Sequence, residues 1–162
     1  MKLYLRQKVF SFGDKFTVLD AYGNTAFTVE GEVFTIGKKL HVYDPSGEER
    51  LFIKQRPWKL LSTYELYEKG EKTAEVVKRF ALRPKYDIHG PAWYVEGTFW
   101  EHDYNIIQNG FSVVSIHKRW MDWGDSYEID IAESVDLLTA LGVVLVIDCV
   151  MAAEAAAAAA ST

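Results

Sequence analysis

Cysteine is nearly missing from this chain, since Cys149 is the only one among 162 residues. A single cysteine excludes a disulfide framework and a cysteine-based zinc site, and it suits a reducing compartment. In residues 1–8 charged side chains interrupt the sequence before an apolar run as long as the core of a signal peptide can form, so no secretory signal is expected. The expected location is therefore the cytoplasm.

The sequence also lacks the motifs of catalysis and of cofactor binding. It contains no Gly-x-Ser-x-Gly elbow, no glycine-rich phosphate loop before a helix and no dinucleotide fingerprint. The four histidines His41, His89, His102 and His117 do not have metal-ligand spacing. His102-Asp103 is set aside as a catalytic pair, because a general base also needs a pocket and a partner. We expect no catalytic residue, no metal and no cofactor.

Basic residues are absent from the end of the chain. All 18 Lys and Arg lie at or before Arg119, so residues 1–120 carry a net charge of +3 and residues 121–162 a net charge of −8. The overall charge of −5 argues against bulk nucleic-acid binding, which needs a strongly basic domain. A local anion site on the first 120 residues stays open.

The composition that is present is that of one ordinary globular domain, with 49% hydrophobic, 25% charged and 14% aromatic residues. The high aromatic share favours sheet over a helical bundle. Alternating segments separated by Gly, Asn, Pro or Asp turns predict five antiparallel hairpins, at residues 16–29, 40–54, 64–77, 86–95 and 104–116. Residues 127–131 open a sixth, so we expect eleven or twelve strands.

The hairpins repeat as a larger unit. Val29-Glu30-Gly31 matches Val95-Glu96-Gly97, and Tyr64-Glu65-Leu66 matches Tyr127-Glu128-Ile129. Because such matches stay in order, residues 16–77 and 86–131 are interpreted as two copies of one three-hairpin unit.

A different pattern begins after residue 131. Residues 132–134 offer an N-cap at Ser134, with Asp136 in the first turn, and residues 137–153 then form a helix that is apolar on every side. Two alternatives are weighed, a strand at residues 143–147 and a membrane anchor. The anchor is disfavoured because Asp148 near a bilayer centre costs about 2.5–3.5 kcal/mol.

The helix and the hairpins explain each other. Eleven or twelve strands enclose a hole wider than their own side chains fill, and an apolar helix about 10–12 Å across fits such a hole. We therefore predict a mainly β (α+β) fold, an antiparallel barrel of about twelve strands around the C-terminal helix. Asp148 is expected at the barrel mouth, and Cys149 is expected as a small core residue. The Ala-rich residues 154–162 are interpreted as a tail, either an exposed extension of the helix or a frayed end.

Several segments together resemble the LURP-one-related family: residues 7–16, residues 20–24, Ile53-Lys54-Gln55, His102-Asp103-Tyr104 and residues 120–127. That family is similar to the C-terminal domain of tubby proteins and to phospholipid scramblases. The resemblance implies a single barrel domain over residues 1–153, with twelve strands around a hydrophobic helix. Tubby domains bind phosphoinositides and scramblase relatives act at membranes, but no tubby binding residue is matched to a position here.

Charge on the predicted barrel is divided between its two ends. The hairpin turns carry acidic residues, whereas the links between hairpins carry basic ones and the aromatics Phe10, Trp58, Phe80 and Trp120. Such a basic end is able to contact anionic headgroups. The alternative is that basic residues only end strands and protect sheet edges. Besides Lys8 at the same end, the candidate lipid-binding or anion-binding residues are Lys54, Arg56, Lys59, Lys78, Arg79, Arg83, Lys85, Lys118 and Arg119.

Three functions follow from these patterns. The first is a non-enzymatic tubby-like binding domain, peripheral at the membrane if it binds anionic lipid. The second is a scaffold or regulator that binds a protein partner, and the third is an enzyme of unknown reaction. No nucleic-acid partner and no transmembrane span are expected.

Overall fold

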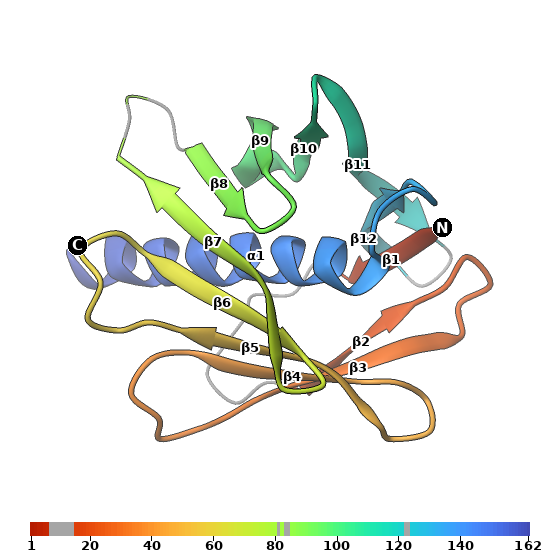
Figure 1. Ribbon diagram of the computed structural model, residues 1–162, viewed down its shortest axis with the longest axis horizontal. Coiled ribbons are helices and arrows are strands. Elements are labelled where there is room, and N and C mark those ends of the chain that lie inside the picture. The colour runs from red at the N-terminus through yellow and green to blue at the C-terminus, as the bar shows by residue number, and fades with distance from the viewer. Residues whose placement is uncertain (7–14, 81, 83–84, 122–123) are drawn as a thin grey trace.

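The computed structural model describes residues 1–6, 15–80, 82, 85–121 and 124–162, and in this part of the chain twelve strands close into one antiparallel barrel around a helix (Figure 1). The helix is α1 (Leu137–Ala160), and a short 3-10 turn, η1 (Phe99–Glu101), joins two strands. The strands are β1 (Lys2–Arg6), β2 (Lys15–Leu19), β3 (Thr25–Gly31), β4 (Lys39–Tyr43), β5 (Glu49–Gln55), β6 (Thr63–Glu68), β7 (Glu71–Arg79), β8 (Lys85–His89), β9 (Trp93–Thr98), β10 (Asp103–Gln108), β11 (Phe111–Met121) and β12 (Gly124–Ile131).

Each strand follows its neighbour in the sequence around the barrel, and β1 closes the ring by pairing with both β2 and β12. The five predicted hairpins are confirmed, including the Asn109-Gly110 turn, where both residues have positive φ (51° and 81°), as a tight hairpin turn requires. The predicted mainly β barrel with an enclosed helix is therefore confirmed.

The two copies predicted from the sequence occupy equivalent places. β2–β7 form three hairpins, and β8–β11 form two more. The third pair of the second copy is β12 with β1, whose residues Leu3 and Ile129 are register partners. The chain leaves β12 to form α1, so β1, from the other end of the sequence, supplies the strand that the second copy lacks.

Alternation places one face of every strand inside. Pairs such as Leu40 with Val42, Leu51 with Ile53 and Ile106 with Tyr104 are buried and point to the helix, while the residues between them face outward. α1 is buried continuously over residues 138–150. A helix that is apolar on all sides needs such an environment, because burial of each large aliphatic side chain stabilises the fold by about 1.5–3 kcal/mol.

The helix meets the barrel wall most closely at Gly142. A methyl group built there would lie 2.5 Å from Cδ2 of Leu66 and 2.9 Å from Cδ2 of Leu51. Glycine therefore lets the helix backbone approach β5 and β6 at a point where any side chain would overlap them.

The helix differs from the expectation only in its N-cap. Asp136 is the N-cap rather than Ser134, because its side chain accepts a hydrogen bond from the Thr139 amide at 2.6 Å. Residues 143–147 are helical and enclosed by the barrel, so neither the strand nor the membrane-anchor alternative describes them, although α1 is long and apolar enough to span a bilayer. The helix also continues through Ala160, so the Ala-rich tail is largely its exposed last turns.

Candidate anion-binding rim

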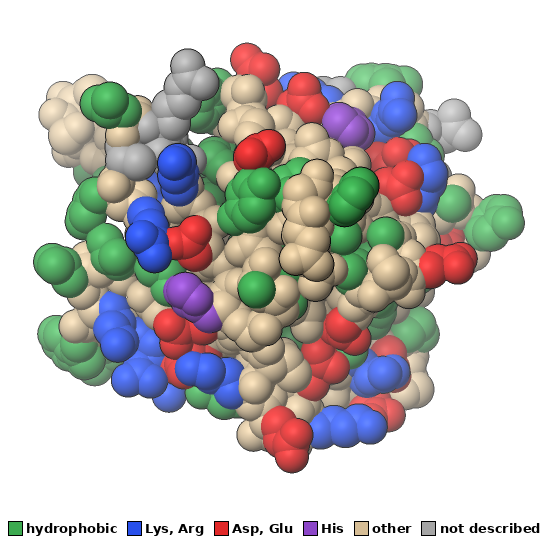
Figure 2. All heavy atoms as spheres, turned by 45° about the horizontal axis from the view of Figure 1, so that its top comes forward, with side chains coloured by type: hydrophobic (Ala, Val, Ile, Leu, Met, Phe, Trp, Pro, Cys, Tyr) green, Lys and Arg blue, Asp and Glu red, His purple; other side chains and the backbone are tan. Residues whose placement is uncertain are grey.

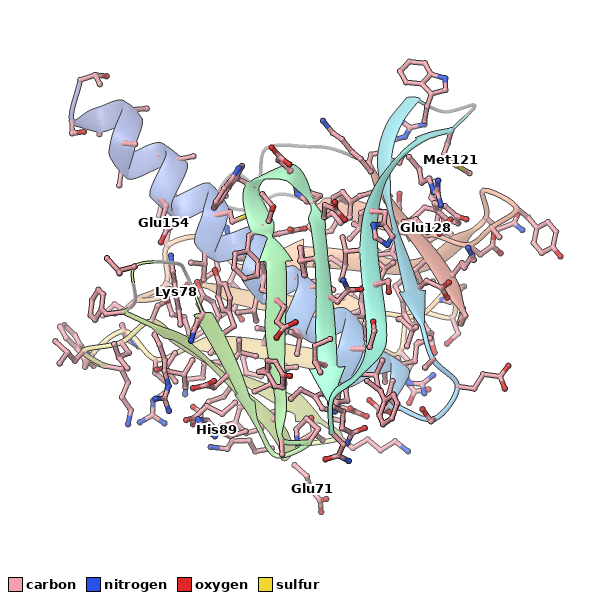
Figure 3. All side chains as sticks on the ribbon, turned by 90° about the horizontal axis from the view of Figure 1, so that it is seen from above. Glu71, Lys78, His89, Met121, Glu128 and Glu154 are labelled. Atoms are coloured by element: carbon pink, nitrogen blue, oxygen red, sulfur yellow. The ribbon has the colours of Figure 1, made fainter. Side chains whose placement is uncertain are left out.

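The barrel has two unlike ends, which we name by the connections they carry. The tip rim holds the hairpin turns, and the link rim holds the links between hairpins, at residues 32–38, 56–62, 80–84 and 99–102 together with the end of β11. Figure 3 shows Glu71 and His89 at the tip rim and Met121 and Glu154 toward the opposite end. α1 enters the barrel after β12 at the tip rim and leaves it at the link rim.

The acidic residues of the tip rim have structural partners in the turns. Asp20 accepts hydrogen bonds from the backbone amides of Tyr22 and Asn24, at 2.8 and 2.9 Å, and these bonds lower its pKa despite the opposing effect of desolvation. Asp44 binds the Ser46 amide at 2.9 Å in the same way. These carboxylates fold the hairpin turns, which is the usual role of aspartate there.

Four of the nine predicted basic residues lie at the link rim without a carboxylate partner among the described residues, and three of them lie on β5, on β8 or in the link between β5 and β6. Lys59 and Lys85 are exposed, and Lys54 is half-buried on the outer face of β5. Lys59 comes from the β5–β6 link, and Lys85 begins β8 after the next link along the barrel. Their charge is therefore available to an external anion.

Three further candidates at this rim are held in ion pairs. Arg56 contacts Glu65 at 3.0 Å, Arg79 contacts Asp87, and Lys78 contacts Glu154 on the emerging helix (Figure 3). Burial opposes ionisation of Glu65, but hydrogen bonds from Arg56 and Lys72 outweigh it and lower its pKa. These pairs fasten the rim, so their charges are partly neutralised.

The remaining candidates lie on another part of the link rim or outside the described residues. Lys118 and Arg119 lie near the end of β11, which β9 and β10 separate from β8 in the barrel. Arg119 is 3.8 Å from Glu128, whereas Lys118 is exposed. Arg83, like Lys8 and Phe10, falls outside the described residues.

Hydrogen bonds connect neighbouring links through the strands beside them. The amide of Lys78 donates to the Ser62 carbonyl at 2.9 Å, which ties β7 to the β5–β6 link. The amide of Gln55 donates to the Lys38 carbonyl at 2.8 Å, and the Gln55 side chain accepts from the Lys38 amide at 2.9 Å. The links 32–38 and 56–62 and the end of β7 therefore form one continuous sector of the rim, which Phe80 and Leu82 extend among the described residues.

Aromatic side chains are exposed between these basic residues, as the sequence indicated for Trp58, Phe80 and Trp120. Sequence reasoning missed other large hydrophobic residues that are exposed at the same end, namely Val33, Phe34, Ile36, Leu60, Leu82 and Trp100. Their position in short links could have indicated this exposure. A residue in a link is not part of a strand, so alternation does not turn its side chain into the barrel.

The carboxyl group of Asp148 lies inside the barrel, on the helix. Asp148 was expected at the mouth, but this is wrong, since the residue is only 3% exposed. Its Oδ2 accepts a hydrogen bond from the hydroxyl of Tyr127, and its Oδ1 lies 3.6 Å from Nε2 of His102, whose ring stacks on Tyr127. Burial raises the pKa of Asp148, and the nearby His102 partly offsets the rise.

The described histidines and carboxylates do not form a metal site or a general-base pair of the kind considered above. Asp103 binds Nδ1 of His117 at 2.8 Å rather than His102. His41 lies between Glu32 and Glu49, at 2.8 and 2.9 Å, on the outer face of the barrel. Among the described residues, no group of three or more histidine, cysteine or carboxylate side chains is placed to hold a metal ion.

Comparison with known proteins places this barrel in a family. The family model of the LURP-one-related proteins matches residues 1–148. The uncharacterized protein YxjI of Bacillus subtilis (strain 168) is 34% identical over 152 residues, which are 93% of this chain and 94% of that protein. A crystal structure of an Arabidopsis thaliana protein has a TM-score of 0.67 at 17% identity, and it covers 92% of this chain and 90% of the plant chain. The structural match shows the shared fold.

Proposed function

This chain belongs to the LURP-one-related family, and from that premise we propose that it is a binding domain which docks on anionic phospholipid headgroups through the link rim. The family and its tubby-like fold are of a non-enzymatic type of domain. We extend this to the chain itself and propose that it has no catalytic activity. The observation that carries the proposal is the gathering of Lys54, Lys59 and Lys85 in one sector of the link rim, without carboxylate partners among the described residues.

The closed barrel supports this interpretation over its alternative. Lysines on sheet edges protect them from pairing with other chains. The ring formed by the described strands is closed, so it has no free edge that would need such protection. Edge protection therefore does not explain the basic residues at the ends of β5 and β8. Attraction to a negatively charged surface does explain them.

The expected strength follows from the number of unpaired charges. A lysine near an anionic membrane surface contributes about 1 kcal/mol. Three such lysines contribute about 3 kcal/mol, which corresponds to about a 100-fold preference for anionic over neutral vesicles at moderate salt. Because exposed charges are screened by salt, this preference must decline as the salt concentration rises.

Vesicle flotation tests the proposal. The protein is mixed with phosphatidylcholine vesicles, with or without phosphatidylserine, and the fraction that floats is measured at low and high salt. The double variant Lys59→Gln/Lys85→Gln is expected to lose about tenfold or more in affinity for the anionic vesicles. The matched control is Arg50→Gln/Lys69→Gln, which removes two charges toward the tip rim and should bind as the original chain does. Equal and negligible flotation with both kinds of vesicle would overturn the proposal.

A further inference from the structure

The link rim carries an unusual concentration of exposed apolar side chains. Thirteen large hydrophobic residues are exposed in the described chain, and seven of them lie in the links 32–38, 56–62 and 80–84. We call these seven the apolar crest: Val33, Phe34, Ile36, Trp58, Leu60, Phe80 and Leu82. Large exposed apolar patches on soluble domains mark surfaces that contact a partner or a membrane.

The crest repeats one pattern in each link. An aromatic residue is followed two positions later by an aliphatic one, in Phe34-Thr35-Ile36, Trp58-Lys59-Leu60 and Phe80-Ala81-Leu82. All six of these aromatic and aliphatic side chains are more than 70% exposed. Three links with the same pattern and the same exposure indicate a common role for their side chains.

Local hydrogen bonds and one left-handed residue define the conformation of two of the links. Phe34 has a φ of 59°, in the left-handed region that costs an ordinary L-residue about 1 kcal/mol or more. The hydroxyl of Thr35 donates to the Gly37 carbonyl at 2.8 Å, and the hydroxyl of Thr63 donates to the Leu61 carbonyl at 2.9 Å. The links 32–38 and 56–62 are therefore built structures whose exposed apolar groups are part of their fold.

The segments that carry the crest are mainly basic in sequence, although Lys39, Arg56, Lys78 and Arg79 are paired with carboxylates. Residues 32–39, 54–62 and 78–85 contain a single acidic residue, Glu32. The same three segments contain nine basic residues, Lys38, Lys39, Lys54, Arg56, Lys59, Lys78, Arg79, Arg83 and Lys85. Figure 2 shows hydrophobic side chains together with Lys and Arg side chains at the left end of the molecule, the end where the C-terminus and the β5–β6 and β7–β8 links lie in Figure 1.

We infer that the apolar crest inserts into the boundary between headgroups and acyl chains of an anionic bilayer. This inference rests on the proposed headgroup docking and adds the mode of attachment. Aromatic and aliphatic side chains enter this boundary to a depth of about 5–10 Å, with basic side chains at the level of the phosphates above them.

The bilayer is favoured over other occupants by charge and by shape. A second copy of the chain would place the same basic face against itself, and the like charges would repel each other. A rigid protein partner would have to fit apolar side chains on three separate links, whereas fluid lipid adapts to all three. The exposed last turns of α1, residues 153–160, leave the barrel at the same rim. Glu154 is the only charged residue in these turns, and it is paired with Lys78.

A fluorescent label tests insertion directly. Leu60→Cys accepts a thiol-reactive NBD group, and the native Cys149 does not compete, because it is buried and burial raises the pKa of its thiol to about 12. Phe111→Cys, at the tip rim, is the matched control position. With vesicles that contain phosphatidylserine, the Leu60 label is expected to shift to shorter wavelength and to be quenched by lipids that carry a spin label in their acyl chains. The Phe111 label is expected to remain in water.

A pair of variants measures the apolar contribution apart from charge. Trp58→Ser/Phe80→Ser is expected to bind anionic vesicles about 100-fold more weakly, or about tenfold for each side chain, with a loss that persists at high salt. The control Tyr22→Ser/Phe111→Ser removes exposed aromatics at the tip rim and should leave binding unchanged. Because all four side chains are exposed, thermal unfolding should show the same stability in every variant.

The outcomes separate insertion from docking. If the original chain floats with anionic vesicles but the Leu60 label stays in water and the serine variant binds normally, insertion is wrong and headgroup docking stands. If the original chain does not float, both are wrong. If sedimentation shows a dimer without lipid that Trp58→Ser/Phe80→Ser converts to a monomer, the crest is a contact between copies and insertion is wrong.

Discussion

Replacing Asp148 by asparagine is expected to stabilise the protein near neutral pH. Asp148 lies on a helix that is buried from residue 138 to residue 150, and its Oδ1 atom has no hydrogen-bond partner among the described groups. The Nε2 atom of His102 lies 3.6 Å from this Oδ1 atom, which is longer than a hydrogen bond. Ionisation of this carboxyl inside the barrel is therefore only partly compensated.

The sign of the pH dependence follows from the direction of the shift. Burial raises the pKa of folded Asp148 above the ordinary value of 3.8, so the folded state holds its proton to a higher pH than the unfolded state does. The free energy of unfolding consequently falls as the pH rises from 3.8 through the folded pKa. Asparagine does not titrate, and its amide oxygen still accepts the hydrogen bond from Tyr127.

The expected gain near neutral pH is about 1–3 kcal/mol, because a buried carboxylate whose charge is only partly compensated costs at least as much as a buried polar group without a partner. In a chain of this size each kcal/mol raises the Tm by about 2–4 °C. Urea unfolding followed by tryptophan fluorescence over a pH series measures the difference, which should shrink as the pH approaches 3.8. As a control, His102→Gln removes the neighbour that favours ionisation and should steepen the loss of stability with pH. A less stable Asp148→Asn chain, with a gap that does not change with pH, would refute this reasoning.

Four further outcomes follow from the same structure. Burial opposes protonation of His41, but the hydrogen bonds that its ring donates to Glu32 and Glu49 outweigh it and raise the pKa of His41. The stabilisation by His41 is complete below pH 6.5 and is lost as the pH rises through the folded pKa, so the urea midpoints of His41→Gln and the original chain should converge at alkaline pH. Gly142→Leu should destabilise by about 3 kcal/mol in urea unfolding, and Leu66→Ala in the same chain should recover part of the loss. Gly97→Ala should cost about 2 kcal/mol or more, since φ is +128° and a methyl group would lie 2.6 Å from the backbone of β10, and the urea midpoint should fall accordingly. Cys149 should react with Ellman's reagent only when the chain unfolds, so the reaction rate should follow the urea transition.

The hairpins were predictable because their information is local. Alternating residues and turn residues within about twenty positions determine each of them, as in Asn109-Gly110. β1 was not predicted as a strand, because its five residues have no hairpin partner beside them in the sequence. Its partner β12 lies more than 120 residues away, with Leu3 opposite Ile129, and no short-range pattern records that pairing.

The candidate site was predictable in outline for a similar reason. When each strand pairs with the next one in the sequence, hairpin turns lie at one end of the barrel and links at the other. Lys59, Lys85 and Trp58 were therefore expected at the link end, and they lie there. The ion pairs that occupy Arg56 and Lys78 were not foreseen, because Glu65 and Glu154 reach them from another strand and from the helix. The environment of Asp148 depends on Tyr127 and His102, which only the closed barrel brings to the helix.

Hydrogen–deuterium exchange with and without phosphatidylserine vesicles tests most directly whether the link rim is the membrane-facing surface. We expect slower amide exchange in residues 32–38 and 56–62 when anionic vesicles are added, and no change in the turns around Tyr22 and Gly70. Protection confined to those turns, or an unchanged pattern in a sample whose protein floats with the vesicles, would contradict this expectation.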